Sequence, residues 1–519
     1  MDLITRNIHR NRQKGRTVTQ VTLDDDFIVP DTKEDMEALI LDSAAVELED
    51  TRLMGTRLAV KGRLVFRVLY HTQKNRMVDN MEGALPFEEF VNVSDVAEDD
   101  DIRVDWDIED LTASMINSRK LNMKTVITLT VTAEELRDEA VTVEVDGGEG
   151  AETVSEYIEA AQIAVQTRDT YRVKEEVELS ASKPNIAGLL WQELTPRGIE
   201  CRPLDGKLSI HGEMELFCIY RGEEEHVPLQ WVERSIPFSG SIEMPECTDE
   251  MIPAIDIRPV HWEVEAKADY DGEMRLLSAE AVLELDIRLY EELRVGVLSD
   301  IYCPGADVIL ESSEAHLEHL VTRNASKYKM TDKLTLGAVD KILQICHAGG
   351  SVKLDSVEPV ENGLSVEGTL CVDVLYVAAD DLSPVRNIRG MLPFSYTIEA
   401  SGIRPGATFR VKPGLEQLSA MLLGNGELEI KAVIVLDSLV MEPLTLPVIR
   451  SAQIMPLDPA RLEALPGIVG YVVQKGDTLW KIAKKFYASV DNIRETNGLG
   501  GDELEPGQRL LIIKQAERL

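Results

Sequence analysis

One segment occurs three times in the chain, and it constrains the fold more than any other feature. The copies read LAVKGRLVFRVLY, LSIHGEMELFCIY and LSVEGTLCVDVLY, at residues 58–70, 208–220 and 364–376. Every second position of the first and third copies is apolar or glycine, which is the period of a β-strand. The opposite face starts polar at Lys61 and becomes apolar at Leu69, as it does from Glu367 to Leu375. Each strand should therefore be covered on both faces towards its end.

A glycine interrupts the apolar face of each copy at the same point, and these glycines are Gly62, Gly212 and Gly368. Glycine inside a strand usually marks a bulge or a close approach of another backbone. A second landmark follows at a matched distance, namely LPF at 85–87, IPF at 236–238 and LPF at 392–394. The glycines are 150 and 156 residues apart, whereas solenoid and propeller repeats span roughly 20–50 residues. The pattern therefore predicts three whole domains in series.

Further alternating segments open and close the repeats. Residues 17–28 open the first repeat, and residues 124–131, 279–289 and 427–436 close the three copies. Residues 31–41 carry Met36, Leu39 and Ile40 at helical spacing, which predicts a short helix capped by Asp31 or Thr32, with equivalents at 183–191 and 339–346. We expect a mainly β chain of three tandem β-sandwich-like or barrel-like repeats, each with a short helix, at 16–150, 165–300 and 325–450.

Composition and charge limit the compartment in which the protein can reside and the classes of partner that it can bind. The net charge of −38 argues against nucleic acid or an anionic membrane as a partner, because both demand clustered Lys and Arg. Residues 1–17 lack the apolar core of a secretory signal, and no stretch approaches the roughly 20 apolar residues of a membrane span. The six cysteines have no paired spacing, and Cys218 and Cys371 lie in the repeated strand, where small buried hydrophobes belong. We expect a cytoplasmic protein without membrane insertion.

Several local patterns resemble functional sites but lack part of the required chemistry. The acidic runs at 24–26 and 98–101 lack a complete calcium-loop pattern, and the glycine-rich segment 147–150 lacks the Lys and Ser/Thr of a phosphate loop. His316 and His319 in EAHLEHL have no second ligand pair, so an exposed helix between the repeats is expected instead of a metal site. A glycosidase needs two flanking carboxylates, yet no acid recurs at a repeated landmark. We expect no enzyme, no metal and no cofactor.

The C-terminal segment differs in kind from the repeats. After a proline-containing linker at 451–469, residues 470–515 begin with a short strand, and the turn Gly476-Asp477-Thr478 caps a helix. Leu479, Ile482, Ala483 and Phe486 follow at i, i+3, i+4 and i+7, so Leu479 and Ile482 are expected in the core, with Trp480 off this stripe. A second helix begins after Ser489 and ends at Asn497-Gly498, and the strand 510–513 completes a β-α-α-β unit.

The segment GYVVQKGDTLWKIAKKF, followed by SVDNIRETNGL and LEPGQRLLI, resembles the LysM domain family. LysM domains usually bind N-acetylglucosamine polymers in a groove between the loop after the first strand and the loop before the last. The resemblance implies a groove at Gly476, Asp477, Thr478, Leu479, Trp480, Asn497, Gly498 and Leu499. Because Trp480 lies off the apolar stripe, it is the contact that we expect a partner to use.

The three repeats, each an LxVxGxLxVxVLY-type strand followed by an LPF segment, resemble the SPOCS domains of sporulation proteins. Three such repeats with one LysM domain resemble the SipL-like family of spore coat morphogenetic proteins. That resemblance implies a non-enzymatic scaffold in the mother-cell cytoplasm at the forespore surface. It also implies that the LysM domain docks on the coat-basement ATPase SpoIVA, with other coat proteins as further partners. The alternative is a cell-wall protein that binds peptidoglycan through N-acetylglucosamine.

Overall fold

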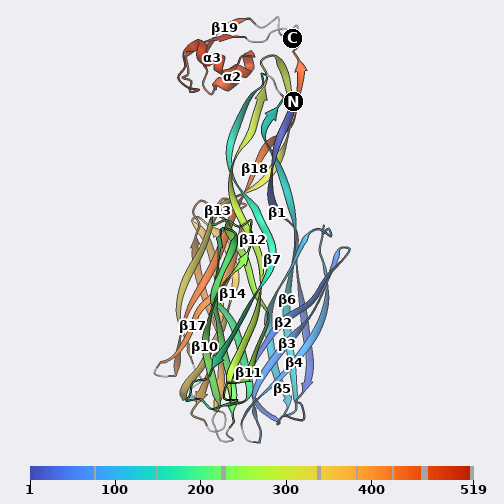
Figure 1. Ribbon diagram of the computed structural model, residues 1–519, viewed down its shortest axis with the longest axis vertical. Coiled ribbons are helices and arrows are strands. Elements are labelled where there is room, and N and C mark those ends of the chain that lie inside the picture. The colour runs from blue at the N-terminus through green and yellow to red at the C-terminus, as the bar shows by residue number, and fades with distance from the viewer. Residues whose placement is uncertain are drawn as a thin grey trace.

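The computed structural model describes residues 1–74, 77–147, 150–223, 229–335, 341–380, 384–423, 426–457 and 466–514. The molecule is elongated (Figure 1). Three β domains lie together at one end, a stalk of long strands rises from them, and a small module lies at the far end of the stalk. Both chain ends lie at the module end of the molecule.

Each repeat contributes six strands. Repeat 1 consists of β1 (Asp2–Ile28), β2 (Met36–Met54), β3 (Arg57–Thr72), β4 (Val78–Asn92), β5 (Asp101–Asn117) and β6 (Lys120–Asp146). Repeat 2 consists of β7 (Glu152–Glu178), β8 (Ile186–Leu204), β9 (Lys207–Gly222), β10 (Gln230–Glu243), β11 (Ile252–Ala268) and β12 (Met274–Tyr302). Repeat 3 consists of β13 (Ala306–Thr335), β14 (Ile342–Val360), β15 (Gly363–Ala378), β16 (Val385–Glu399), β17 (Thr408–Leu423) and β18 (Glu427–Pro456).

The strands of each repeat form two antiparallel sheets that enclose one core. In repeat 1 the sheets have the orders β2-β3-β4 and β1-β6-β5, and the other repeats follow the same plan. The long-strand sheets of repeats 2 and 3 join through one bridge, Glu318 to Ala161. The predicted mainly β fold is confirmed, and of the two architectures left open by the sequence, the repeats adopt the sandwich.

The two repeated landmarks are cross-strand partners. The register pairs Gly62 with Phe87, Gly212 with Phe238, and Gly368 with Phe394. On the other side of each glycine, the neighbouring strand β2, β8 or β14 carries a register shift. Both expected causes of a strand glycine, the bulge and the close approach, are therefore present, because the phenylalanine ring and the bulged backbone crowd the position of a side chain.

The other face of each repeated strand is buried towards its end, as predicted, and the cover comes from the other repeats. Leu69, Ile219 and Leu375 occupy equivalent positions and lie in one apolar cluster with side chains from all three repeats. The exposed fractions of these three side chains are at most 3 %. The short-strand sheets of the three repeats thus meet through the apolar ends of the repeated strands.

The prediction of an exposed helix between the repeats is wrong. The segments around residues 146–169 and 294–327 lie largely in β7, β12 and β13, which continue past the sandwiches together with β1, β6 and β18. These six strand extensions surround an apolar cluster that includes Ile8, Val295 and Val448, and they form the stalk. The long strands therefore run past the expected repeat ranges of 16–150, 165–300 and 325–450. Gly147 and Gly150 lie between β6 and β7 with positive φ, and residues 148–149 lie outside the described residues.

The prediction of a short helix in each repeat is also wrong. Residues 31–33 form a turn and bend, and β2 begins at Met36; β8 and β14 begin at the equivalent positions, Ile186 and Ile342. Arg119 holds the turn by donating hydrogen bonds to the carbonyl oxygens of Val29 and Lys33, each at 2.9 Å. These bonds fix the backbone in the turn conformation. Of the predicted segment 339–346, residues 339–340 lie outside the described residues.

Candidate functional site

The C-terminal module has the predicted β-α-α-β order. It consists of β19 (Ile468–Val472), α2 (Leu479–Phe486), α3 (Val490–Asn497) and β20 (Arg509–Ile513). Within the described residues, α2 and α3 are the only helices. The predicted core positions Leu479 and Ile482 are 2 % and 1 % exposed, and they pack against Ile493 of α3 and the inward side chains of β20. The amphipathic pattern thus identified the buried face of α2 correctly.

The first predicted groove loop is stabilised by its own side chains. Gly476 has a φ of 91°, which only glycine adopts at low cost. Asp477 accepts hydrogen bonds from the Gln474 backbone N–H and from the Tyr471 hydroxyl, both at 2.8 Å, and these bonds lower the pKa of the Asp477 carboxyl. Thr478 caps α2 by accepting a hydrogen bond from the Lys481 backbone N–H. Asp477 and Thr478 therefore shape this loop.

The second predicted loop is fixed in the same way. Asn497 donates hydrogen bonds to the carbonyl oxygens of Ile493 at 2.8 Å and Leu511 at 2.7 Å, and it accepts one from the Leu511 backbone N–H at 2.6 Å. Gly498 ends α3 in the left-handed conformation, and Leu499 is partly buried against the module core. The Asn497 side chain is consequently occupied in joining α3 to β20.

Both loops lie at the same end of the two-stranded sheet of β19 and β20. Hydrogen bonds of 2.8–2.9 Å join Val473 to Gly507 and Gln508, where the first loop leaves β19 and the second loop enters β20. Gly476, Thr478, Gly498 and residues 500–503 are exposed. The loops therefore present mainly backbone and small side chains to the surroundings, held in place by Asp477, Thr478 and Asn497.

Trp480, the expected partner contact, lies against the tip of the stalk. It is half-buried, and its indole Nε1 donates a hydrogen bond of 2.9 Å to Asp300 at the end of β12. Its ring also meets the Tyr302 ring edge-on, with 4.8 Å between the centroids. Trp480 is thus hydrogen-bonded to another part of the chain, in keeping with the position of the module at the end of the stalk (Figure 1).

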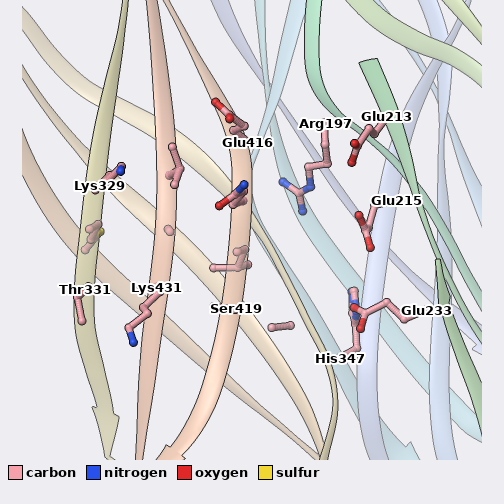
Figure 2. A pocket seen from close by; sticks show the side chains of 16 residues that line it. Arg197, Glu213, Glu215, Glu233, Lys329, Thr331, His347, Glu416, Ser419 and Lys431 are labelled. Carbon is pink, nitrogen blue, oxygen red and sulfur yellow. The ribbon is translucent and has the colours of Figure 1, made fainter. Parts of the chain in front are cut away.

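A cavity of about 620 Å³ between repeats 2 and 3 is a second candidate site, which the sequence did not predict. Figure 2 shows that Arg197, Glu213, Glu215 and His347 project into it from one side, opposite Lys329 and Lys431. Its wall combines strands more than 100 residues apart, so only the packing of two repeats creates it. No periodic signal in the sequence marks such a site.

His347 is the most constrained side chain of this cavity. Its Nδ1 lies 2.7 Å from Glu233 and its Nε2 lies 3.5 Å from Glu193, while its ring stacks on Phe217 with 4.0 Å between the centroids. Burial by itself lowers the pKa of His347, but the two carboxylates outweigh burial and raise it to about 9. His347 is thus a cation at neutral pH that joins β14 of repeat 3 to β8 and β10 of repeat 2.

Three of the four glutamates that line this cavity are occupied in hydrogen bonds or ion pairs. Glu213 accepts a hydrogen bond from Ser235, Glu233 pairs with His347, and Glu416 pairs with Lys327. Burial raises the pKa of Glu215. Of these contacts, the His347–Glu233 pair joins repeats 2 and 3, whereas the Glu213 and Glu416 contacts each lie within one repeat. A larger cavity of about 970 Å³ lies between the three repeats and shares Arg197, Glu215 and His347 with the first.

The histidine pair between the repeats does not form the expected helix surface. His316 and His319 lie on β13, and His316 contacts Thr445 whereas His319 faces Glu159. Across the described residues, no group of three or more His, Cys, Asp and Glu side chains is placed to hold a metal ion. In the same part of the chain, no helix is both long and apolar enough to cross a membrane.

Comparison with known proteins identifies both parts of the chain. Residues 26–116, 185–267 and 341–423 match the family model described as "SipL, SPOCS domain", and residues 471–512 match the LysM domain. The three SPOCS segments correspond to the short-strand sheets together with β5, β11 and β17. Most of the stalk lies outside these matches.

Among the curated proteins, a stretch of 48 residues is 48% identical to "Uncharacterized protein YkzQ" of Bacillus subtilis (strain 168). The match covers 9% of this chain and 60% of that protein, so the chain spans less than two thirds of this relative. No solved structure matches the chain.

SPOCS and LysM domains are non-catalytic, and they indicate a sporulation-related protein with a cell-wall glycan-binding module. With three segments that match the SPOCS domain of SipL, followed by a LysM domain, the chain has a SipL-like architecture.

Proposed function

We propose that this chain is a non-enzymatic scaffold of endospore coat assembly, which docks through its LysM module on the coat-basement ATPase SpoIVA. In this proposal it acts in the mother-cell cytoplasm at the forespore surface. The observation that carries the proposal is the position of the module at the end of a stalk, away from the three sandwiches (Figure 1). The paired stalk strands extend by about a dozen residues beyond the sandwiches, which is roughly 40 Å at 3.3 Å per residue. This spacing suits a protein that joins two layers.

The sandwiches supply surfaces for assembly instead of an active site. Glu213, Glu233 and Glu416, which line the cavity between repeats 2 and 3, are engaged in hydrogen bonds or ion pairs that join strands. We propose that other coat proteins bind the exposed surfaces of the three sandwiches, while the module determines where the chain is recruited.

A second candidate function is supported by the exposure of both groove loops. In LysM domains these loops bind N-acetylglucosamine polymers, and Gly476, Thr478 and Gly498 are exposed here. The chain would then bind peptidoglycan, with the stalk holding the module towards the glycan.

Binding of the full chain to purified SpoIVA and to N-acetylglucosamine oligomers discriminates between the two functions. We expect binding to SpoIVA, its loss in a chain that ends at residue 457, and its loss in the Trp480→Glu variant with an unchanged circular dichroism spectrum. Retained binding by Trp480→Glu would exclude Trp480 from the contact. Binding to the oligomers alone would reject the scaffold in favour of the glycan-binding function.

A further inference from the structure

The tip of the stalk presents two side chains to the LysM module from the same face of one strand. Asp300 and Tyr302 lie two residues apart at the end of β12, so both side chains point the same way. Tyr302 is only 4 % exposed and belongs to the apolar core of the module, although it is a residue of repeat 2. The stalk thus inserts a side chain into the module.

Two residues of α2 bind the Asp300 carboxylate. Trp480 donates from Nε1 to one carboxylate oxygen at 2.9 Å, and the Lys484 ammonium binds the other oxygen at 2.5 Å. Trp480 and Lys484 are four residues apart and therefore lie on the same side of the helix. This pair recognises a carboxylate at a fixed position, because an indole N–H and a cation each contact a separate oxygen.

The Tyr302 side chain is recognised at both its ring and its hydroxyl. The ring packs edge-on against Trp480, and the hydroxyl donates a hydrogen bond of 2.9 Å to the Ala488 carbonyl oxygen between α2 and α3. A buried tyrosine with a satisfied hydroxyl contributes apolar burial without an unpaired polar group. Tyr487 adds a further hydrogen bond from its hydroxyl to Asp307 on β13, at 2.9 Å.

The contact with the stalk covers one side of the module and leaves the groove loops uncovered. Trp480, Lys484, Tyr487 and Ala488 face the stalk, whereas Gly476, Thr478, Gly498 and residues 500–503 remain exposed. A ligand that uses the loops can therefore bind while the module is docked. A protein that uses the Trp480 side meets a surface that is already occupied.

We propose that Asp300 and Tyr302 are an intramolecular ligand of the LysM module, which masks Trp480 until a protein partner displaces the stalk. The proposal rests on the function proposed above, in which a protein docks through Trp480. Docking on the stalk and docking on the partner then compete, whereas an N-acetylglucosamine oligomer at the loops does not compete. The apparent dissociation constant for the partner rises in inverse proportion to the fraction of undocked module. With about ten docked molecules for each undocked one, removal of the stalk contact tightens partner binding about tenfold.

The test compares the full chain with the Asp300→Ala variant and with the Asp300→Ala/Tyr302→Ala double variant. Asp138→Ala is the matched control, because Asp138 lies on the stalk and contacts His9 and Asn7, not the module. Hydrogen exchange detected by mass spectrometry reports the docking itself. We expect faster exchange at residues 298–307 and 479–490 in both test variants, with the sandwiches and the control unchanged.

Titration with SpoIVA and with N-acetylglucosamine oligomers then tests the competition. We expect about tenfold tighter SpoIVA binding by the test variants and equal oligomer binding by all four proteins. Unchanged exchange would overturn the intramolecular contact, and faster exchange with equal or weaker SpoIVA binding would overturn the competition. If none of the proteins bound SpoIVA, the proposed scaffold function and the competition would both fall, and the exchange pattern would still decide whether the stalk binds the module.

Discussion

The glycine of each repeated strand provides a graded test of the packing. Replacement of Gly368 by alanine would place its Cβ 2.5 Å from the Lys353 carbonyl oxygen and 2.7 Å from Cζ of Phe394. Both distances are well below ordinary van der Waals contact. At Gly212, by contrast, the nearest atom is the Ile199 Cγ1, at 3.0 Å, followed by the Ile199 Cα at 3.1 Å. The same substitution should therefore be far costlier in repeat 3 than in repeat 2.

The magnitude follows from which atoms can move. Overpacking a well-packed site costs about 1–3 kcal/mol, while replacing a strand glycine by alanine recovers roughly 0.5–1 kcal/mol. Because a backbone oxygen of β14 cannot shift without disturbing its bulge, the cost should lie at the upper end of this range, and we expect Gly368→Ala to lower the free energy of unfolding by about 2 kcal/mol. Gly212→Ala should cost less than about 1 kcal/mol, because its three nearest atoms lie at 3.0–3.1 Å and shifts of a few tenths of an ångström relieve these contacts.

Urea unfolding of the full chain, followed by circular dichroism and by tryptophan fluorescence, measures these differences. The companion variant Phe394→Leu removes the ring contact but leaves the Lys353 carbonyl oxygen in place. Introduced into Phe394→Leu, Gly368→Ala should therefore still lower the free energy of unfolding, although by less than it does in the wild-type chain. The argument that the bulged backbone requires glycine would be refuted by equal destabilisation in Gly212→Ala and Gly368→Ala. It would also be refuted if the double variant were as stable as Phe394→Leu.

Three further predictions concern contacts that the structure assigns. The pKa of His347 is raised to about 9, so its contribution to stability is complete below the unfolded-state pKa of about 6.5 and is lost as the pH rises through about 9. The melting temperature of the wild-type chain should therefore fall over this pH interval, and that of His347→Ala should not show this fall. Arg119→Ala should lower the free energy of unfolding in urea by about 2 kcal/mol, because it leaves the carbonyl oxygens of the turn before β2 without their donor. Arg275 bonds to carbonyl oxygens of the corresponding turn in repeat 2, so Arg275→Ala should cost a similar amount. Asn497→Ala should speed hydrogen exchange in β20 but not in the sandwiches; an unchanged rate would show that its side-chain bonds do not stabilise the module.

Period-two alternation predicted the strands at the centre of each repeat because both of their faces are specified. One face fills the sandwich core, and the other becomes apolar where it enters the cluster around Leu69, Ile219 and Leu375. The helical spacing in the LysM module was equally informative, since α2 buries Leu479 and Ile482 on a single stripe. In these elements the local pattern and the tertiary burial agree.

The failed helix prediction shows where this agreement ends. β2 has register shifts between Met36 and Ala38 and between Leu39 and Leu41, so consecutive residues do not alternate regularly between its faces. Met36 faces the sandwich core, whereas Ile40 and Leu41 lie in the cluster between the repeats. Two bulges in a strand with two buried faces thus reproduced the spacing of an amphipathic helix.

The stalk and its contact with the module are long-range features that local patterns cannot reveal. Alanines at 160, 161 and 315 contribute to the burial at or near the stalk, and such small residues give a weak apolar signal. The groove loops were identified through the LysM resemblance, and the structural roles of Asp477, Thr478 and Asn497 became apparent only from their hydrogen bonds. Asp300 carries no sequence signal, because its function depends on a helix about 180 residues away.

The contacts that close the three repeats into one body use the same positions with different chemistry. Each repeated strand ends in a tyrosine, and the residue after this tyrosine lies against another repeat. Its partner there is the residue seven positions before the LPF or IPF landmark. The pairs are His71 with Val385, Arg221 with Val78 and, within one shared apolar cluster, Val377 with Leu229. The first pair joins an imidazole to a carbonyl oxygen at 2.9 Å, the second uses a guanidinium, and the third is apolar. Because the acceptors of His71 and Arg221 are main-chain carbonyl oxygens, which any residue at these positions supplies, the contacts tolerate different side chains. The packing of the three repeats therefore depends on the shared backbone geometry at these positions and on the apolar cluster that all three repeats enter.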